Sequence, residues 1–182
     1  MTRGRFITLE GGDGAGKTTQ IKALQSALEA EGLTVVVTRE PGGSAGAEEI
    51  RTLLLHGHDY HWDGLTEALL NYAARRDHIL KTIEPALADG TWVISDRFFD
   101  STTAYQGVGH GVTADTLNVL RTAAIGDFAP DLTLILDLPV DVGQGRVQAR
   151  GGAKDRFELL DRDFYERLRQ AFLNIADAEP NR

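Results

Sequence analysis

The sequence has 182 residues, a net charge of −8 and no cysteine, and 42% of its residues are hydrophobic. This length fits one domain with a substantial core, and the absence of cysteine excludes disulfides, thiolate catalysis and cysteine-based zinc sites. The acidic balance argues against binding to a nucleic acid polymer, and with neither a signal peptide nor a membrane-spanning apolar run we expect a cytoplasmic protein.

The first predicted elements surround a glycine-rich motif. A short apolar strand over residues 6–10 leads into Gly-Gly-Asp-Gly-Ala-Gly-Lys-Thr at 11–18, and a helix is predicted over 18–31. This is G-x-x-x-x-G-K-[ST] in the strand-to-helix context of a phosphate-binding P-loop. The glycines let backbone N–H groups converge on an anion at the positive end of the helix dipole. We expect this loop to bind a nucleoside triphosphate.

The rest of the chain alternates strands with helices. Strands are predicted over 33–38, 92–95 and 132–137, and helices over 47–55, 65–89, 114–124, a short segment through 147, and 157–178. The long helix over 65–89 should kink near Pro85, and its predicted buried stripe is Leu65, Leu69, Tyr72, Ile79, Ile83 and Leu87. Glycine-rich loops are expected over 107–111 and 150–156, and a solvated loop with three histidines over 56–64. This alternation indicates a parallel α/β sheet that binds ligands at the carboxyl ends of its strands.

The strand ends narrow the kind of P-loop protein. The Asn/Thr-Lys-x-Asp motif by which GTPases read guanine is absent, and the strand at 92–95 ends in Asp96-Arg97 rather than in the acidic pair of a motor. Asp96 would supply a carboxylate to the metal region, and Arg97 would supply a cation to a second phosphate. This arrangement suits phosphoryl transfer between two phosphorylated molecules. An arginine-flanked lid would keep water from the γ-phosphate. The residues therefore favour a small-molecule kinase.

From residue 6 to about 178 the sequence resembles the bacterial thymidylate (dTMP) kinases. The shared motifs are the P-loop with Glu10 before it, Thr-Arg-Glu-Pro-Gly-Gly at 38–43, Ala-Ala-Arg-Arg-Asp-His at 73–78, Asp-Arg at 96–97, Ser-Thr-Thr-Ala-Tyr-Gln-Gly at 101–107 and Asp-Arg-Phe-Glu at 155–158. The resemblance implies a P-loop NTPase-type three-layer sandwich with a parallel sheet, in a single domain over 1–182 with a lid at about 148–157. It also implies a homodimer and Mg²⁺-dependent, in-line transfer of the γ-phosphate of ATP to dTMP, a step of dTTP biosynthesis.

The resemblance also assigns site residues. The implied ATP site is Gly11, Gly12, Asp13, Gly14, Ala15, Gly16, Lys17, Thr18, Thr19 and Arg146. The implied dTMP site is Asp13, Glu40, Pro41, Arg51, Asn71, Tyr72, Arg75, Arg97, Ser101, Thr102, Tyr105, Gln106 and Phe157. Within it, Arg75 and Arg97 would clamp the phosphate, Asp13 would approach the sugar 3′-hydroxyl, and Phe157 would crowd the 2′ position. Thr18 and Asp96 would serve the metal, and the catalytic residues would be Lys17, Asp13, Arg97, Arg150 and Arg156.

Two departures from the family pattern, and one position that varies within the family, leave questions open. The family often has a phenylalanine where this chain has Asn71, so either Asn71 contacts thymine or Tyr72 replaces the stacking ring. The variable P-loop position is Gly14, so Arg150 and Arg156 of the lid must supply the catalytic charge. The family continues with a fifth strand and a final helix, so we expect a truncated C-terminus. The alternatives are a kinase for another nucleoside monophosphate, and a nucleotide-binding protein without turnover.

Overall fold

The structure, a computed structural model, describes residues 2–56, 62–151 and 161–182. Its elements are β1 (Phe6–Glu10), α1 (Lys17–Ala30), β2 (Val35–Arg39), α2 (Ala45–His56), α3 (Gly64–His78), η1 (Ile79–Ile83), α4 (Glu84–Ala88), β3 (Trp92–Asp96), α5 (Phe99–Thr102), η2 (Thr103–Gly109), α6 (Ala114–Ile125), β4 (Leu132–Ile135), α7 (Val140–Arg150) and α8 (Arg162–Ala178). None of the helices described has the length and apolar character needed to cross a membrane.

The four described strands form one parallel sheet in the order β2-β3-β1-β4. In its register Leu9 of β1 pairs with Asp96 of β3 and with Leu134 of β4. Because the strands are parallel, their carboxyl ends meet along one edge of the sheet. The predicted α/β architecture is confirmed, and the residues that follow β1, β2 and β3 are brought together at that edge.

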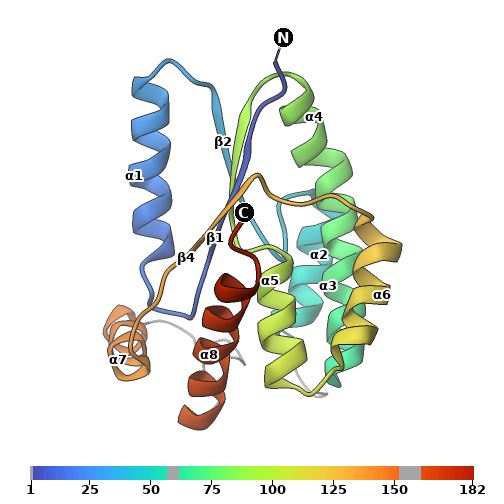
Figure 1. The fold of residues 1–182 in the computed structure, drawn as a ribbon, viewed down its shortest axis with the longest axis vertical. Helices are drawn as coiled ribbons and strands as arrows, with labels where there is room; N and C mark the ends of the chain where they lie inside the picture. The colour runs from blue at the N-terminus through green and yellow to red at the C-terminus, as the bar shows by residue number, and fades with distance from the viewer. Residues whose placement is uncertain (1, 57–61, 152–160) are drawn as a thin grey trace.

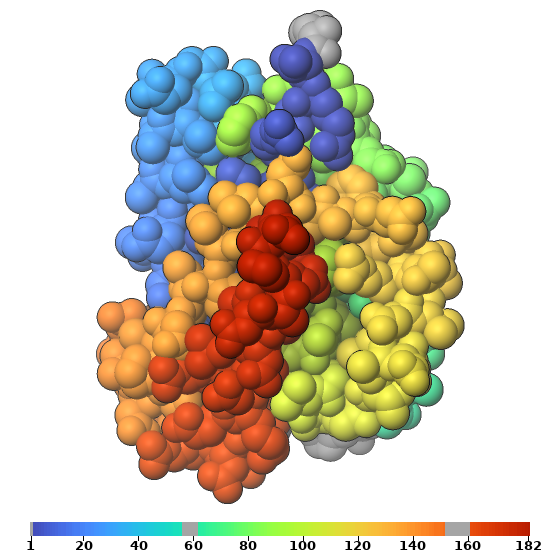
Figure 2. Space-filling model, in the orientation of Figure 1, coloured from blue at the N-terminus to red at the C-terminus, as the bar shows by residue number. Residues whose placement is uncertain are grey.

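Helices cover both faces of the sheet, with α1 on one side and α3, α4 and α6 on the other (Figure 1). Alternation along β1 turns Ile7 and Leu9 toward α1, where Ile21 packs, and turns Phe6 toward the opposite core with α3 and α6. Glu10 falls on the same face as Phe6. Helix α8 packs against β4 and η2, and it crosses the front of the molecule beside α7 (Figure 2).

The predicted long helix is interrupted rather than continuous. Residues 64–88 form α3, η1 and α4, and the wider π-helical turn of η1 lies just before Pro85. Proline lacks the N–H that would bond four residues back, and its ring crowds that carbonyl, so the helix widens there. The predicted buried stripe was wrong at Leu65 and Leu69, which are 44% and 49% exposed, whereas Ile79, Ile83 and Leu87 are buried as expected.

One predicted loop and the predicted start of the last helix also differ from the structure. The glycine-rich segment predicted as a loop over 107–111 belongs in part to η2, which continues from α5 through Gly109. The last helix begins at Arg162, where the Asp161 side chain caps it by accepting a hydrogen bond from the Phe164 N–H. Residues 152–160, which contain most of the predicted lid together with Arg156 and Phe157, lie outside the described part of the chain.

Candidate active site

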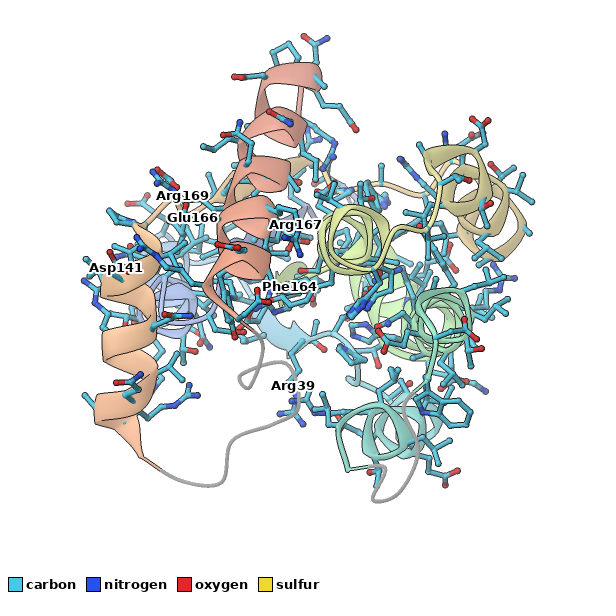
Figure 3. All side chains as sticks on the ribbon, turned by 90° about the horizontal axis from the view of Figure 1, so that it is seen from below. Arg39, Asp141, Phe164, Glu166, Arg167 and Arg169 are labelled. Carbon is cyan, nitrogen blue, oxygen red and sulfur yellow. The ribbon has the colours of Figure 1, made fainter. Side chains whose placement is uncertain are left out.

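A cavity of about 720 Å³ opens at the carboxyl edge of the sheet. Its volume falls within the usual range for small-molecule sites. Of the predicted residues, it is lined by Asp13, Gly14, Gly16, Lys17, Thr18, Thr19, Glu40, Pro41, Arg51, Asn71, Arg75, Asp96, Arg97, Ser101, Thr102, Tyr105, Gln106, Arg146 and Arg150. Figure 3 looks at this edge from below, with Arg39 at the end of β2 between α7 and α2. The cavity therefore joins the P-loop to the segments around Arg75 and Gln106.

The P-loop adopts a backbone that only glycine accepts readily. Gly14 has φ 77°, and a β-carbon there would lie 2.3 Å from the carbonyl oxygen of Gly143 in α7. Gly16 has φ 97° and immediately precedes α1, which begins at Lys17. Side chains at these positions would be strained, and at Gly14 would also push α7 away. The loop therefore keeps its backbone N–H groups close to the helix N-terminus, as an anion site requires.

The Lys17 ammonium lies inside this loop. Its Nζ donates to the carbonyl oxygens of Gly11 and Gly12, each at 3.0 Å, and the side chain is buried. Burial and the nearby Arg97 lower the pKa of Lys17 to about 8, against the attraction of Asp13 and Asp96. A bound polyphosphate would add negative charge beside the ammonium and favour its protonated form.

Arg97 and Asp13 meet across the mouth of the loop. Nη2 of Arg97 donates to Oδ1 of Asp13 at 2.8 Å, and Nη1 donates to the Gly11 carbonyl and to Oγ of Ser101. Arg97 has φ 72°, a left-handed backbone conformation that is uncommon for a residue with a side chain. Burial opposes ionisation of Asp13, but the charges of Arg97 and Lys17 hold its pKa below the usual value. The pair is thus ionised at the mouth of the P-loop.

Tyr105 forms the adjoining wall. Its hydroxyl lies 3.2 Å from both Nη2 of Arg97 and Oδ2 of Asp13, and its ring packs against Phe164 with 6.2 Å between centroids. Phe164 belongs to α8 (Figure 3). The Asp13–Arg97 pair is therefore braced by η2 and α8 as well as by the P-loop. Motif reading did not identify Phe164.

Beneath this pair is Glu10, a fully buried carboxyl that was not assigned a role from the sequence. It accepts hydrogen bonds from the Phe98 N–H at 2.7 Å and from Oγ of Ser101 at 2.6 Å. Since Ser101 also accepts from Arg97, Glu10 helps to orient the Arg97 guanidinium. Burial and the nearby Asp100 raise the pKa of Glu10 to about 7. The sequence signal that could have identified Glu10 was its position at the end of β1, just before the P-loop.

Glu10→Gln should change how stability depends on pH. In the unfolded chain the Glu10 carboxyl loses its proton near its ordinary pKa of 4.5, but in the folded protein it does so near 7. Its contribution to stability is therefore fully present below about 4.5 and is lost as pH rises through 7. We expect the melting temperature of the wild type to fall relative to Glu10→Gln between pH 5 and pH 8, as measured by circular dichroism. Glu29→Gln, on the exposed face of α1, should keep the wild-type profile, and parallel profiles for Glu10→Gln would contradict the prediction.

A second buried network holds Arg75 at the other end of the cavity. Nε of Arg75 donates to Oε2 of Glu40 at 2.7 Å, and Nη2 donates to the Phe98 carbonyl and to Oγ1 of Thr102. The remaining Nη1 is the single buried side-chain nitrogen or oxygen atom without a hydrogen-bond partner in the described part of the chain. A buried, unpaired N–H is costly, and this donor is the one member of the network that no described protein atom satisfies.

His78 completes this network from behind. Its Nδ1 lies 2.9 Å from Oε1 of Glu40, and its Nε2 lies 2.7 Å from Oγ1 of Thr38. In the tautomer with its proton on Nδ1, His78 donates to Glu40, and Nε2 accepts a hydrogen bond from the Thr38 hydroxyl. His78 is fully buried, and it went unassigned although it closes the motif at 73–78.

The structure places Asn71 and Tyr72 on different faces of α3. Asn71 lines the cavity, with its Nδ2 donating to the Glu67 backbone carbonyl at 2.9 Å. Tyr72 is absent from the cavity wall and is buried in the core, with its ring 4.9 Å from the Arg75 guanidinium. Tyr72, which was expected in the dTMP site, instead supports Arg75 from the core, because its ring lies on the helix face turned away from the cavity.

Three predicted cations reach the cavity from other elements. Arg51 donates to the Pro41 carbonyl at 2.7 Å, and Arg146 of α7 donates to the Gly14 carbonyl at 3.2 Å. Arg150, the last residue of α7, also lines the cavity. Arg39, which also lines the cavity, instead binds Glu48 in an exposed pair. Of the P-loop residues, Gly11, Gly12 and Ala15 face a smaller space between the loop, β4 and α8.

A divalent cation would find few protein ligands here. No cluster of three or more histidine or carboxylate side chains occurs within residues 2–56, 62–151 and 161–182. The exposed Thr18 hydroxyl and the partly buried Asp96 carboxylate both line the cavity. Mg²⁺ at nucleotide sites commonly takes one or two protein oxygens and completes its shell with phosphates and water. These two residues fit that pattern.

Comparisons with known proteins agree with this geometry. A family model described as thymidylate kinase matches residues 9–182. The thymidylate kinase of Bradyrhizobium sp. strain BTAi1 is 56% identical over 182 residues, which cover 99% of this chain and 80% of that protein. That of Caulobacter vibrioides is 55% identical, covering 100% of this chain and 87% of that protein. The crystal structure of thymidylate kinase from Ehrlichia chaffeensis aligns with a TM-score of 0.80 and 39% identity, over 99% of this chain and 90% of that one.

Proposed function

Starting from the fact that the chain belongs to the thymidylate kinase family, we propose that its cavity holds ATP and dTMP with their phosphates meeting beside Lys17 and Arg97. The protein transfers the γ-phosphate of ATP to dTMP, giving ADP and dTDP. The observation that carries the arrangement is that one cavity joins the P-loop to the buried network around Arg75. In-line transfer needs donor and acceptor positioned along such a path.

At the donor end, the P-loop backbone and the N-terminus of α1 would hold the β- and γ-phosphates. Lys17 would leave the Gly11 and Gly12 carbonyls and donate to the phosphate oxygens, placing its charge where charge develops in the transition state. Arg146, bonded to the Gly14 carbonyl, lies at the outer side of the loop, where the nucleoside of ATP would extend. Thr18 and Asp96 would hold Mg²⁺, which would supply positive charge against the phosphates.

At the acceptor end, Arg97 is the cation best placed for the dTMP phosphate, since it lies against the P-loop. Asp13 keeps this guanidinium turned toward the loop and remains ionised. The acceptor phosphate is already an anionic nucleophile, so the transfer needs no general base. The contribution of Arg97 is to reduce repulsion between the two anionic groups as they approach.

For Arg75 we propose a role other than the phosphate clamp expected from the sequence. Its charge is already balanced by Glu40 at 2.7 Å, and the Tyr72 and Phe98 rings flank its guanidinium. Such a group acts as a directional donor more than as a source of charge for a dianion. We propose that Nη1 donates to a carbonyl oxygen of thymine, in the part of the cavity lined by Asn71, Thr102 and Gln106.

The remaining expectations belong to the same proposal. Arg150 and Arg156 would bring positive charge to the transferred phosphoryl group from a lid at about 148–157, and Phe157 would restrict the sugar 2′ position. We also propose a single kinase domain, a cytoplasmic location and a homodimer. Leu53 on α2 and Leu65 and Leu69 on α3 are exposed leucines that a second copy could cover.

An acceptor panel tests the function directly. Release of ADP, coupled to an optical assay, would be measured with ATP, Mg²⁺ and each of dTMP, dUMP, dCMP, dGMP and UMP. We expect the highest kcat/KM with dTMP. A higher value with another monophosphate would identify a different nucleoside monophosphate kinase, and tight ATP binding in calorimetry without turnover of any acceptor would identify a nucleotide-binding protein.

A further inference from the structure

Glu67 is a buried carboxylate that the mechanism above does not use. It lies near the start of α3, only 1% of its surface is exposed, and it is not part of the cavity wall. Its Oε2 accepts a hydrogen bond of 2.8 Å from Nε2 of Gln106, a residue of η2 that does line the cavity. Glu67 therefore lies behind a side chain of the cavity wall.

This hydrogen bond fixes which end of the Gln106 amide faces the nucleotide. A carboxylate can only accept, so the amide NH₂ must point to Glu67 and the carbonyl Oε1 must point elsewhere. Gln106 is 3% exposed, and its Oε1 accepts no hydrogen bond from any residue that the structure describes. The cavity wall thus carries a fixed, unpaired acceptor where the base is proposed to bind.

We propose that Glu67 is a positioning residue that sets the base specificity of this site, by holding Gln106 as an acceptor toward N3 of the pyrimidine. The inference rests on the proposed position of dTMP. Thymine and uracil have one N–H donor on this edge, at N3, whereas cytosine has a lone pair there. Against the fixed carbonyl, cytosine would place two acceptors face to face, and a site built for a hydrogen bond rejects a partner that cannot form it.

Glu67→Gln tests the inference with little change in shape. A glutamine at 67 can donate as well as accept, so Gln106 becomes free to turn its NH₂ toward the base. We expect kcat/KM for dCMP relative to dTMP to rise by about 10-fold, the size of one hydrogen-bond preference. The ratio of dUMP to dTMP should stay within about 2-fold of the wild type, because uracil keeps the N3 donor. A purely structural role for Glu67 would lower all three values together.

An exchange variant provides the matched control. In Glu67→Gln/Gln106→Glu, the amide at 67 donates to the carboxylate at 106, whose second oxygen again presents an acceptor to the base. We expect this double variant to regain discrimination against dCMP relative to Glu67→Gln. It also decides the question if the single variant fails to fold, as judged by its melting curve.

The outcomes separate the two levels of the proposal. If the wild type prefers dTMP over dCMP but Glu67→Gln leaves that preference unchanged, the role of Glu67 is overturned and the dTMP site stands. Failure of the exchange variant to restore discrimination would also overturn it. If the wild type uses dCMP as readily as dTMP, both the acceptor assignment and this inference are wrong.

Discussion

Lys17→Ala is expected to lower kcat by about 10³-fold while the fold remains intact, a loss comparable to that of a transition-state donor in other enzymes. Lys17 is the one lysine in the described cavity wall. Its ammonium donates hydrogen bonds to two P-loop carbonyl oxygens, and phosphate oxygens can take their place as acceptors. The fold should tolerate the change, because burial already disfavours this charge and lowers its pKa to about 8. Turnover by ADP release and the melting curve by circular dichroism measure the two effects.

Lys22→Ala is the matched control for this experiment. Lys22 lies on the exposed face of the same helix, α1, so its removal should leave both turnover and melting temperature close to the wild type. A kcat for Lys17→Ala within a few-fold of the wild type would remove Lys17 from the mechanism. A large drop in melting temperature for Lys17→Ala would show that the ammonium is needed for the P-loop conformation itself.

Arg75→Met should destabilise the protein by about 3–5 kcal/mol, because it leaves the buried Glu40 carboxylate without its cation. For a chain of this size that corresponds to a fall in melting temperature of roughly 10 °C. The Phe98 carbonyl and the Thr102 hydroxyl also lose their shared donor. The KM for dTMP should rise more than the KM for ATP, since Arg75 lies in the acceptor end of the cavity.

Two further variants isolate the charge effect. Arg76→Met changes the next residue of α3, which is exposed, and should leave the melting temperature near the wild type. Adding Glu40→Gln to Arg75→Met removes the unpaired carboxylate and should recover much of the lost stability without restoring dTMP affinity. If Arg75→Met melts at the wild-type temperature, the Glu40–Arg75 pair has no structural importance.

The P-loop and the strands were predictable because their signals are local. Residues 11–18 contain the complete spacing of the motif, and β1 and β3 were located to within one residue at each end from short apolar runs. Parallel strands bring their carboxyl ends to one edge of the sheet, so Asp96-Arg97 and Glu40 could be placed near the P-loop from the sequence alone. Helix faces were harder. Leu65 and Leu69 fit the helical period, but Ala68 takes the buried face beside Tyr72, whose burial was predicted correctly.

The positioning contacts were beyond sequence reading because each joins residues far apart in the chain. Glu67 and Gln106 are 39 residues apart, and Glu40 and Arg75 are 35 apart. A single sequence does not distinguish a buried glutamate from a surface glutamate. The burial of Glu67 and Glu40 depends on how α3 packs against η2 and β2. The choice between Asn71 and Tyr72 has the same origin, since adjacent residues of a helix point about 100° apart and packing decides which one faces the cavity.

By itself, the sequence determined that this protein is a parallel α/β P-loop kinase and predicted which loop binds phosphate, because a glycine-rich loop between a strand and a helix specifies that backbone locally. Only the tertiary structure decided how the acceptor end is built. It buries Arg75 against Glu40 and His78, leaves one N–H of Arg75 unpaired, and turns the Gln106 carbonyl away from Glu67. These features depend on long-range packing that excludes water, which gives a fixed donor or acceptor its selectivity.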